Sequence, residues 1–394
     1  MKQFVSISAI CLVGLAPLAR TQPQPPVTRE GKYWVRTISG VAVAVPTERF
    51  RLETVGNVVV QGDNSKNRIS FKLKARVRAR DAQEAEGILR QFEARAKTQG
   101  GLTYFTVTPP RNIAESPELT LSVPRDLQQV WIETRGGNVQ AMNLDGEVEA
   151  RSGGGTISVD GVRGRTGINT GGGDVQVGTI GGPVRCYSGA GVIRAQNVGA
   201  DSWFETAGGE IFVHQVNGPL HAATAGGNIR VDRAAGTVFA RTAAGLIEVG
   251  QADGTVTAES SGGAIQVNAA NGVRCDSTGG AIRLRNVIGT MHASTAVGSI
   301  LAELLSGNRI QDSTLSTNAG DITVFISSNV PLTVMARNES GGTMGRIVSD
   351  FPEIQPRGSL LGYSPVVAQG ALNGGGPLLR ITVVGGTIYL RRQK

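Results

Sequence analysis

A sequence repeat of about eighteen residues, called the phrase below, occurs ten times from Glu133 to Gln311. Each copy has the same pattern of apolar and polar positions. Position five of the phrase is always Gly, and position seven is always Val or Ile. Position nine is Ala, Val or Leu, whereas position eight varies freely. This alternation has the period of two that is typical of a strand with one buried face.

The second half of the phrase repeats the first, with Gly at position fourteen in nine phrases and small or apolar residues nearby. Two strands and two glycine corners complete one coil, and glycine suits a corner that needs positive φ or a close backbone approach. We therefore predict an all-β protein, a parallel β-solenoid with two strands in each coil of about eighteen residues. A β-sandwich also contains short alternating strands. It does not explain an aligned Gly at position five and an aligned Ser or Thr at position two.

Residues 31–130 do not follow the phrase, and we expect a small N-terminal α+β cap there. Phe50 to Val60 and Arg68 to Val77 alternate as strands. Asp81 and Glu84 form a capping-box pattern, and apolar residues follow at helical spacing as far as Ala96. This pattern predicts a helix that ends at Gly100 and Gly101.

The solenoid itself is predicted over residues 131–349. Ser316 to Val324 matches the phrase as an eleventh coil, and Ser340 to Met344 matches it as a frayed twelfth. Residues 350–394 are predicted to form an irregular excursion, rich in Pro and Gly as far as residue 376, and a terminal strand from Ile381 to Leu390.

The first residues predict export. Lys2 precedes an apolar run from Phe4 to Ala16, so residues 1–21 are typical of a signal peptide and residues 22–30 of a Pro-rich linker. The run is too short for a membrane span, and no second candidate follows, so no transmembrane span is predicted. We expect an exported protein that is periplasmic, on the cell surface or secreted.

The chain resembles a bacterial family of exported β-strand-repeat proteins known as DUF4097. The resemblance covers roughly residues 40–394 and is carried by VGNVVVQG, by LSVPRD before the repeat, and by GGGPLLRITVVGGTIYLRR near the end. The family carries the name adhesin, which implies adhesion to a partner and assigns no catalytic residues.

The formal net charge of +8 is spread over outward positions, with carboxylates between the arginines. That pattern favours a solvated surface over a nucleic-acid stripe, and we predict no nucleic-acid partner. Cys186 and Cys275 share an inward column but lie five coils apart, about 24 Å at parallel-strand spacing. A disulfide needs Cα atoms within about 7 Å, so both thiols are predicted to be free and buried.

The sequence offers little chemistry. The outward acids are scattered, and Asp145, Glu147 and Glu149 precede Arg163 and Arg165 on the next coil, which favours charge pairing over catalysis. No acidic column matches a calcium β-roll, and the three His residues lie in different columns or several coils apart. We therefore predict no catalytic residue, no metal site and no cofactor.

Binding is the function class that remains. Trp203, Phe212 and Phe239 occupy nominally outward positions, where aromatics mark a contact patch for sugar or protein unless another segment of the chain covers them. The sequence predicts an exported, non-catalytic protein of structural or adhesin-like role, which binds an envelope or extracellular protein or glycan. The alternative is a polysaccharide-active β-helix lyase or hydrolase. Neither the identity of the partner nor the oligomeric state follows from the sequence.

Overall fold

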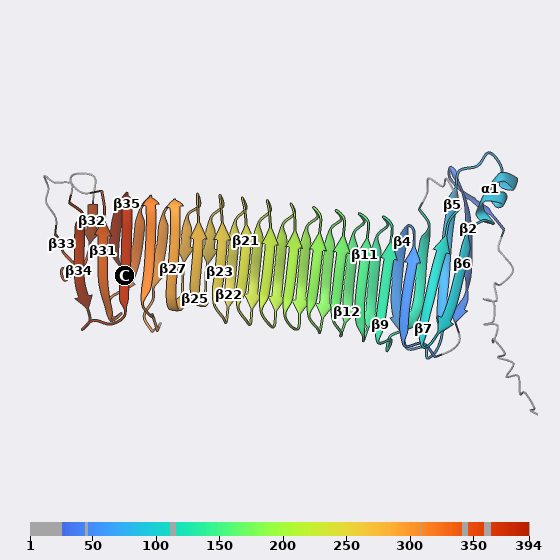
Figure 1. Cartoon of the computed structure of the whole chain (residues 1–394), viewed down its shortest axis with the longest axis horizontal. Helices are drawn as coiled ribbons and strands as arrows, with labels where there is room; N and C mark the ends of the chain where they lie inside the picture. The colour runs from blue at the N-terminus through green and yellow to red at the C-terminus, as the bar shows by residue number, and fades with distance from the viewer. Residues whose placement is uncertain are drawn as a thin grey trace, which may run out of the picture.

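A computed structural model describes residues 26–43, 46–110, 116–307, 309–340, 346–357 and 364–393. The predicted signal segment lies outside these residues. The described chain forms a long rod of stacked strands with a short helix at one end (Figure 1). The rod is a nearly all-β solenoid of mostly parallel strands, so the predicted fold class is confirmed.

Two ladders of parallel strands form the rod, and each coil contributes one strand to each ladder. The first ladder contains β9 (Gln129–Thr134), β11 (Glu147–Ser152), β13 (Thr166–Thr170), β15 (Val184–Ser188), β17 (Ser202–Thr206), β19 (Leu220–Thr224), β21 (Val238–Thr242), β23 (Val256–Ser260), β25 (Ala270–Ser277), β27 (Val287–Val297) and β29 (Ser313–Ala319). The second ladder contains β10 (Val139–Leu144), β12 (Ile157–Val162), β14 (Val175–Ile180), β16 (Ile193–Val198), β18 (Ile211–Val216), β20 (Ile229–Ala234), β22 (Ile247–Ala252), β24 (Ile265–Val267), β26 (Ile282–Leu284), β28 (Ile300–Leu304) and β30 (Ile322–Ser327).

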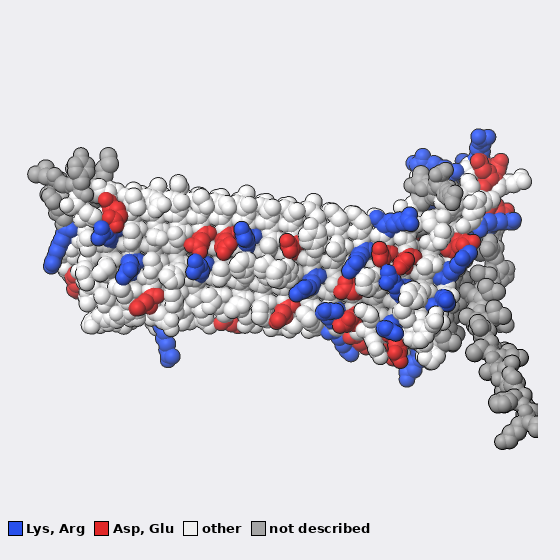
Figure 2. Space-filling model, viewed as in Figure 1, with Lys and Arg blue, Asp and Glu red and all other residues white. Residues whose placement is uncertain are grey.

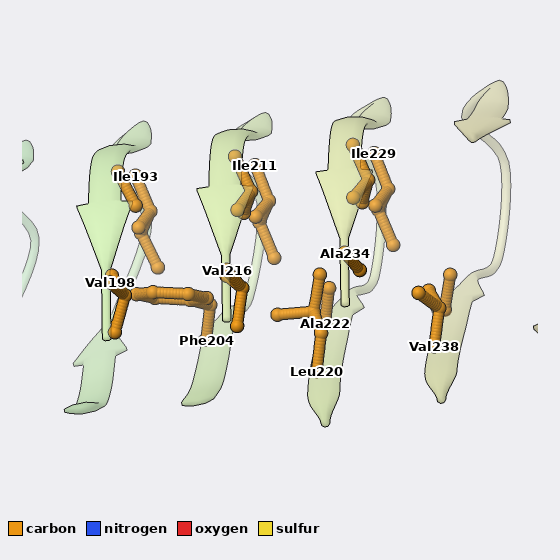
Figure 3. Close-up of a cluster of buried hydrophobic side chains, with 14 of the residues drawn as sticks. Ile193, Val198, Phe204, Ile211, Val216, Leu220, Ala222, Ile229, Ala234 and Val238 are labelled. Atoms are coloured by element: carbon orange, nitrogen blue, oxygen red, sulfur yellow. The ribbon is translucent and has the colours of Figure 1, made fainter. Parts of the chain in front are cut away.

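The core lies between the ladders and repeats with the coil. Ile211 pairs with Ile193 on one side and Ile229 on the other, so position seven forms a continuous inward column. Phe204 is completely buried, and its ring reaches towards Val198 (Figure 3). Close packing of equivalent columns explains why inward positions hold mostly Val, Ile and Ala.

The Ser or Thr at position two links consecutive coils at the corner. The Oγ1 of Thr206 donates to the carbonyl of Gly191 in the preceding coil at 2.9 Å. The same oxygen accepts from the backbone N–H of Gly209 in its own coil at 3.3 Å. Ser188, Thr224 and Thr242 repeat both bonds. Each hydroxyl therefore satisfies one backbone donor and one backbone acceptor at a partly buried corner.

The glycine at position five is required by close approach. A Cβ on Gly209 would lie 2.0 Å from the carbonyl oxygen of Gly191, and one on Gly227 would lie 2.0 Å from that of Gly209. From Gly137 to Gly298, no glycine at position five has positive φ. The glycine at position five is therefore needed for the close approach of the backbones and not for a positive φ.

At the N-terminal end, an early coil lies inside the stack. The strands β3 (Arg49–Thr54) and β4 (Asn57–Asp63) pair in parallel with β9 and β10. On their other side they pair with β7 (Leu102–Thr108) and β8 (Glu118–Pro124). The ladders therefore continue well into residues 31–130, where an α+β cap is expected.

Antiparallel strands cover that end of the rod. In the first ladder β6 (Glu93–Gln99) pairs antiparallel with β7. In the second, β5 (Ile69–Val77) pairs antiparallel with β8, β2 (Tyr33–Val43) with β5, and β1 (Thr28–Glu30) with β2. β1 lies within the stretch expected to be a linker. Antiparallel covers of this kind block the addition of a further parallel coil.

The predicted helix is present but shorter than expected. It is α1 (Ala82–Leu89), and its N-cap Asp81 accepts from the backbone N–H of Glu84 at 2.8 Å. The prediction that it continues to Gly100 and Gly101 is wrong, because Glu93–Gln99 form β6. Both glycines have positive φ and form the tight turn from β6 to β7.

At the C-terminal end, the chain inserts a late coil into the stack. The strands β35 (Leu378–Gly385) and β36 (Thr387–Gln393) pair in parallel with β29 and β30. On their other side lie β31 (Leu332–Asn338) and β32 (Arg346–Ser349), although these precede them in the chain. Figure 1 shows the C-terminus inside the rod rather than at its tip.

The eleventh coil predicted at Ser316 to Val324 is confirmed as β29 and β30. Gly341 to Met344, the larger part of the predicted twelfth coil, lie outside the described residues, and β35–β36 stack on β29–β30 instead. The excursion is less irregular than expected, because β34 (Val366–Leu372) pairs antiparallel with β31 and with the short β33 (Pro356–Arg357). Ala368 of β34 is buried and pairs with Ala336 of β31. The Gly and Pro content of this segment did not predict the strand.

Both cysteines of the repeat are free and buried, as predicted. Burial raises the pKa of Cys275 to about 12, so this thiol stays protonated. It behaves as a small apolar side chain in the core.

Thr206→Val keeps the shape of the side chain but removes the hydroxyl. We expect the free energy of unfolding to fall by about 2–4 kcal/mol, because the Gly191 carbonyl and the Gly209 N–H both lose a partner in a partly buried corner. Thr206→Ser, which retains the hydroxyl, is the control and should cost less than half as much. Chemical denaturation measures both, and equal losses would contradict a bridging role for the hydroxyl.

Ile229→Asp places a carboxylate in the dry core and should cost at least about 4 kcal/mol in the free energy of unfolding. Arg230→Gln, one residue along and outward, should change it by only about 0.5 kcal/mol. The Arg230 guanidinium pairs with Asp232 at 3.3 Å and with Glu248 at 3.6 Å on the exposed surface, where such pairs contribute little. Similar shifts in the two thermal melts would refute the inward and outward assignment.

Candidate functional site

The outer face of the first ladder carries an aromatic stack. Trp203, His221 and Phe239 occupy position seventeen in three consecutive coils and pair directly across β17, β19 and β21. The ring centroids of Trp203 and His221 are 3.5 Å apart, with an angle of 18° between the ring planes. Those of His221 and Phe239 are 4.7 Å apart at 6°. We call these three residues the ring stack.

Trp203 is the most exposed member of the ring stack and is held from two sides. Its side chain is 43% exposed. One ring face contacts His221, and its Nε1 donates to the carboxylate of Glu205 at 3.3 Å. Stacking and this hydrogen bond fix the ring before any ligand arrives, which lowers the entropy lost on binding.

His221 is electrostatically coupled to this arrangement. Partial burial between two rings lowers the pKa of His221, and the nearby Glu205 carboxylate opposes that shift only in part. The neutral imidazole is therefore favoured at neutral pH, and the ring stack carries no positive charge of its own.

The aromatics expected to form a patch separate into two locations. Trp203 and Phe239 lie on the first-ladder face, joined by His221. Phe212 lies on β18 in the second ladder, where it pairs with Arg194 and Arg230. Phe204, next to Trp203 in sequence, belongs to the core.

Three open hollows follow the same face. The first, of about 300 Å³, is bounded by Trp203 and Tyr187 at one end and by Glu149 and Arg151 at the other. The second, of about 330 Å³, lies over Ala207, Ala223 and Ala225. The third, of about 240 Å³, is lined mainly by hydroxyl and charged side chains from Arg241 to Ser294.

Small side chains create these hollows between longer neighbours. Gly167 occupies the same outward column as Trp203, and the Glu149 carboxylate lies over it. Tyr187, in the next outward column, is 43% exposed. The face therefore presents aromatic, carboxylate, amide and guanidinium groups around a shallow floor.

Several outward acids have structural partners. Arg163 pairs with Asp145 at 3.3 Å and Arg165 with Glu147 at 3.5 Å, so the predicted pairing between coils is confirmed. The carboxylate of Asp174 accepts from the backbone N–H of Val192 in the next coil at 2.9 Å. Glu210 accepts from the Asn228 side chain at 2.9 Å.

The charged surface is mixed rather than segregated. Basic and acidic side chains alternate over the face seen in Figure 2, with more of them towards the end that carries α1. Among the residues described here, no group of three His, Cys, Asp or Glu side chains is placed to hold a metal ion. Within the same ranges, no helix has the length and apolar character needed to cross a membrane.

Sequence reasoning missed His221 and Tyr187. The signal for His221 was present, because Trp203, His221 and Phe239 share one column in three successive phrases. Adjacent coils in register bring such residues into contact at about 4.8 Å. The sequence pattern that could have predicted the hollows is weaker. It consists of Gly and Ala at outward positions between residues with long side chains.

Comparison with known proteins adds two distant likenesses. No family model and no curated protein matches the chain, so membership of DUF4097 stays a prediction. One crystal structure, of a putative cell adhesion protein from Clostridium sporogenes, shares 8% identity over 90% of this chain and 99% of that one, with a TM-score of 0.17. Another, of a putative adhesin from Bacteroides fragilis, shares 11% identity over 92% of this chain and 98% of that one, with a TM-score of 0.20. At these TM-scores, neither likeness supports an inference about fold or function.

The lowered pKa of His221 gives a pH prediction. Because the pKa is lower in the folded than in the unfolded chain, the contribution of neutral His221 to stability is complete above the unfolded value of about 6.5. It is lost as the pH falls below that value towards the folded pKa. An NMR titration of the His221 ring should have its midpoint below 6.5, and Trp203→Ala should raise it by uncovering the imidazole. A midpoint above 6.5 in the wild-type chain would contradict burial as the dominant cause.

Proposed function

We propose that this chain is an exported, non-catalytic binding protein of structural or adhesin-like role. In this proposal, the first-ladder face engages an envelope or extracellular partner. The observation that carries the proposal is the exposed Trp203 of the ring stack beside a row of hollows, on a surface whose residues the fold does not require. Inward positions repeat in every coil, whereas the outward ones vary.

The ring stack supports binding because Trp203 is exposed and its ring is preorganised by its neighbours. Exposed aromatics whose orientation is fixed are typical contact residues of interfaces. Trp203 and Tyr187 are among the large hydrophobic side chains that are more than two-fifths exposed, and they lie on neighbouring strands that pair in register.

A polysaccharide-active enzyme is the rival function, because the rod carries exposed carboxylates on both ladders. Asp174 and Glu210 both accept hydrogen bonds that stabilise the packing of successive coils, which favours a structural role for them. Glu205 holds Trp203 in place. These contacts support binding over turnover.

The test combines binding and turnover on the purified full chain. We expect saturable binding to cell-envelope preparations, with the apparent Kd raised roughly tenfold by Trp203→Ala. Phe212→Ala is the matched control, because it removes an aromatic from the opposite ladder and should leave the Kd unchanged. The thermal melt of each variant checks that the fold is intact.

A depolymerisation assay on the same polysaccharides runs in parallel, and we expect no release of reducing ends. Turnover that is lost in Asp174→Asn or Glu210→Gln, while the fold is retained, would establish the enzyme instead. Absence of saturable binding to any envelope fraction would overturn the binding proposal.

A further inference from the structure

We propose that the row of hollows binds one linear, uncharged polysaccharide laid along the axis of the rod. This inference rests on the proposed binding function and specifies the class of ligand. We call the row the axial groove, and it is lined from Glu149 to Ser294.

The three hollows form one continuous path. The first and second share Tyr187 and Glu205. The second and third share Arg241, Thr242 and Ser261. The path covers the strands from β11 to β27, which lie eight steps apart in the first ladder, or about 38 Å at the spacing of paired strands. Only an extended occupant makes use of such a path.

The chemistry of the lining fits a sugar chain. A pyranose ring has faces of C–H groups that pack on aromatic rings, and Trp203 and Tyr187 offer exposed rings at the first hollow. Its hydroxyls donate and accept in the plane of the ring, where carboxylate, amide and guanidinium groups are suitable partners. Glu205, Asn169 and Arg185 supply one of each at the same hollow.

The charge of the groove favours an uncharged chain. The lining contains four carboxylates and three guanidinium groups: Glu149, Glu205, Glu259, Asp276, Arg151, Arg185 and Arg241. Arg241 and Glu259 lie 3.7 Å apart and neutralise each other in part. A nucleic acid or another polyanion would meet more acids than bases, without the basic excess that such ligands need.

The backbone argues against an extended peptide. Peptides that lie along a sheet gain affinity by adding a strand to an open edge. The strands beneath the axial groove, such as β15, β17 and β19, are paired on both sides. Their backbone groups are already used, so recognition must come from side chains alone.

Isothermal titration of the full chain with cellohexaose, xylohexaose, mannohexaose, maltohexaose and chitohexaose tests the proposal. We expect at least one hexasaccharide to bind, and to bind roughly tenfold more tightly than its disaccharide, because the longer chain spans more of the groove. Trp203→Ala and Tyr187→Ala should each weaken binding about tenfold. Phe212→Ala, on the other ladder, should have no effect.

Pretreated envelope preparations separate this proposal from the function on which it rests. If the ligand is a polysaccharide, binding survives protease treatment and is lost after periodate oxidation of the sugars, or after chitinase digestion for a chain of N-acetylglucosamine, which periodate does not cleave. Binding that depends on Trp203 but is destroyed by protease would overturn the polysaccharide and leave the binding function standing. Equal affinity for disaccharide and hexasaccharide, or affinity unchanged by both aromatic variants, would overturn the axial groove.

Discussion

The close contact between successive corner glycines is the constraint on which the rod depends. The carbonyl of one glycine lies where a Cβ of the next would be, so the coils can stack at strand spacing only while that position stays empty. The hydroxyl at position two then joins the same two corners by hydrogen bonds. One glycine and one hydroxyl in each coil set the register of every other column, including the outward ones.

The register of strand pairing brings outward residues that are far apart in the sequence into one site. Trp203, His221 and Phe239 are separated by a full phrase in the chain, yet pairing of β17, β19 and β21 brings their rings into contact. The same pairing places the small Ala223 between the longer side chains of Glu205 and Arg241. The core holds these positions without contributing to their chemistry, so the outer face can vary while the fold is retained.

The regular part of the fold was predictable because the repeat in the sequence and the stacking of the coils have the same period. The pattern of apolar positions therefore also gives the packing of the core. Ile211 is inward for the same reason as Ile193, and the free cysteines follow from the coil count alone. The ends were harder, because they depend on pairing between distant segments. The helical spacing of apolar residues that begins at Ala85 reaches Ala96, but tertiary pairing with β7 makes Glu93–Gln99 a strand. At the site, the exposure of Trp203 was predictable from its column, whereas the hollows depend on how neighbouring side chains lie.

The position of β35 and β36 has a consequence for the order of assembly. These strands follow β31 and β32 in the chain, yet they lie between that pair and the coil formed by β29 and β30. A solenoid that grew coil by coil as it emerged would leave no room for them. The segment that contains β31, β32 and β34 must therefore stand away from the rod until the later coil has docked. Completion of this end is a non-local event with a large loop-closure cost, unlike the local growth of the coils before it.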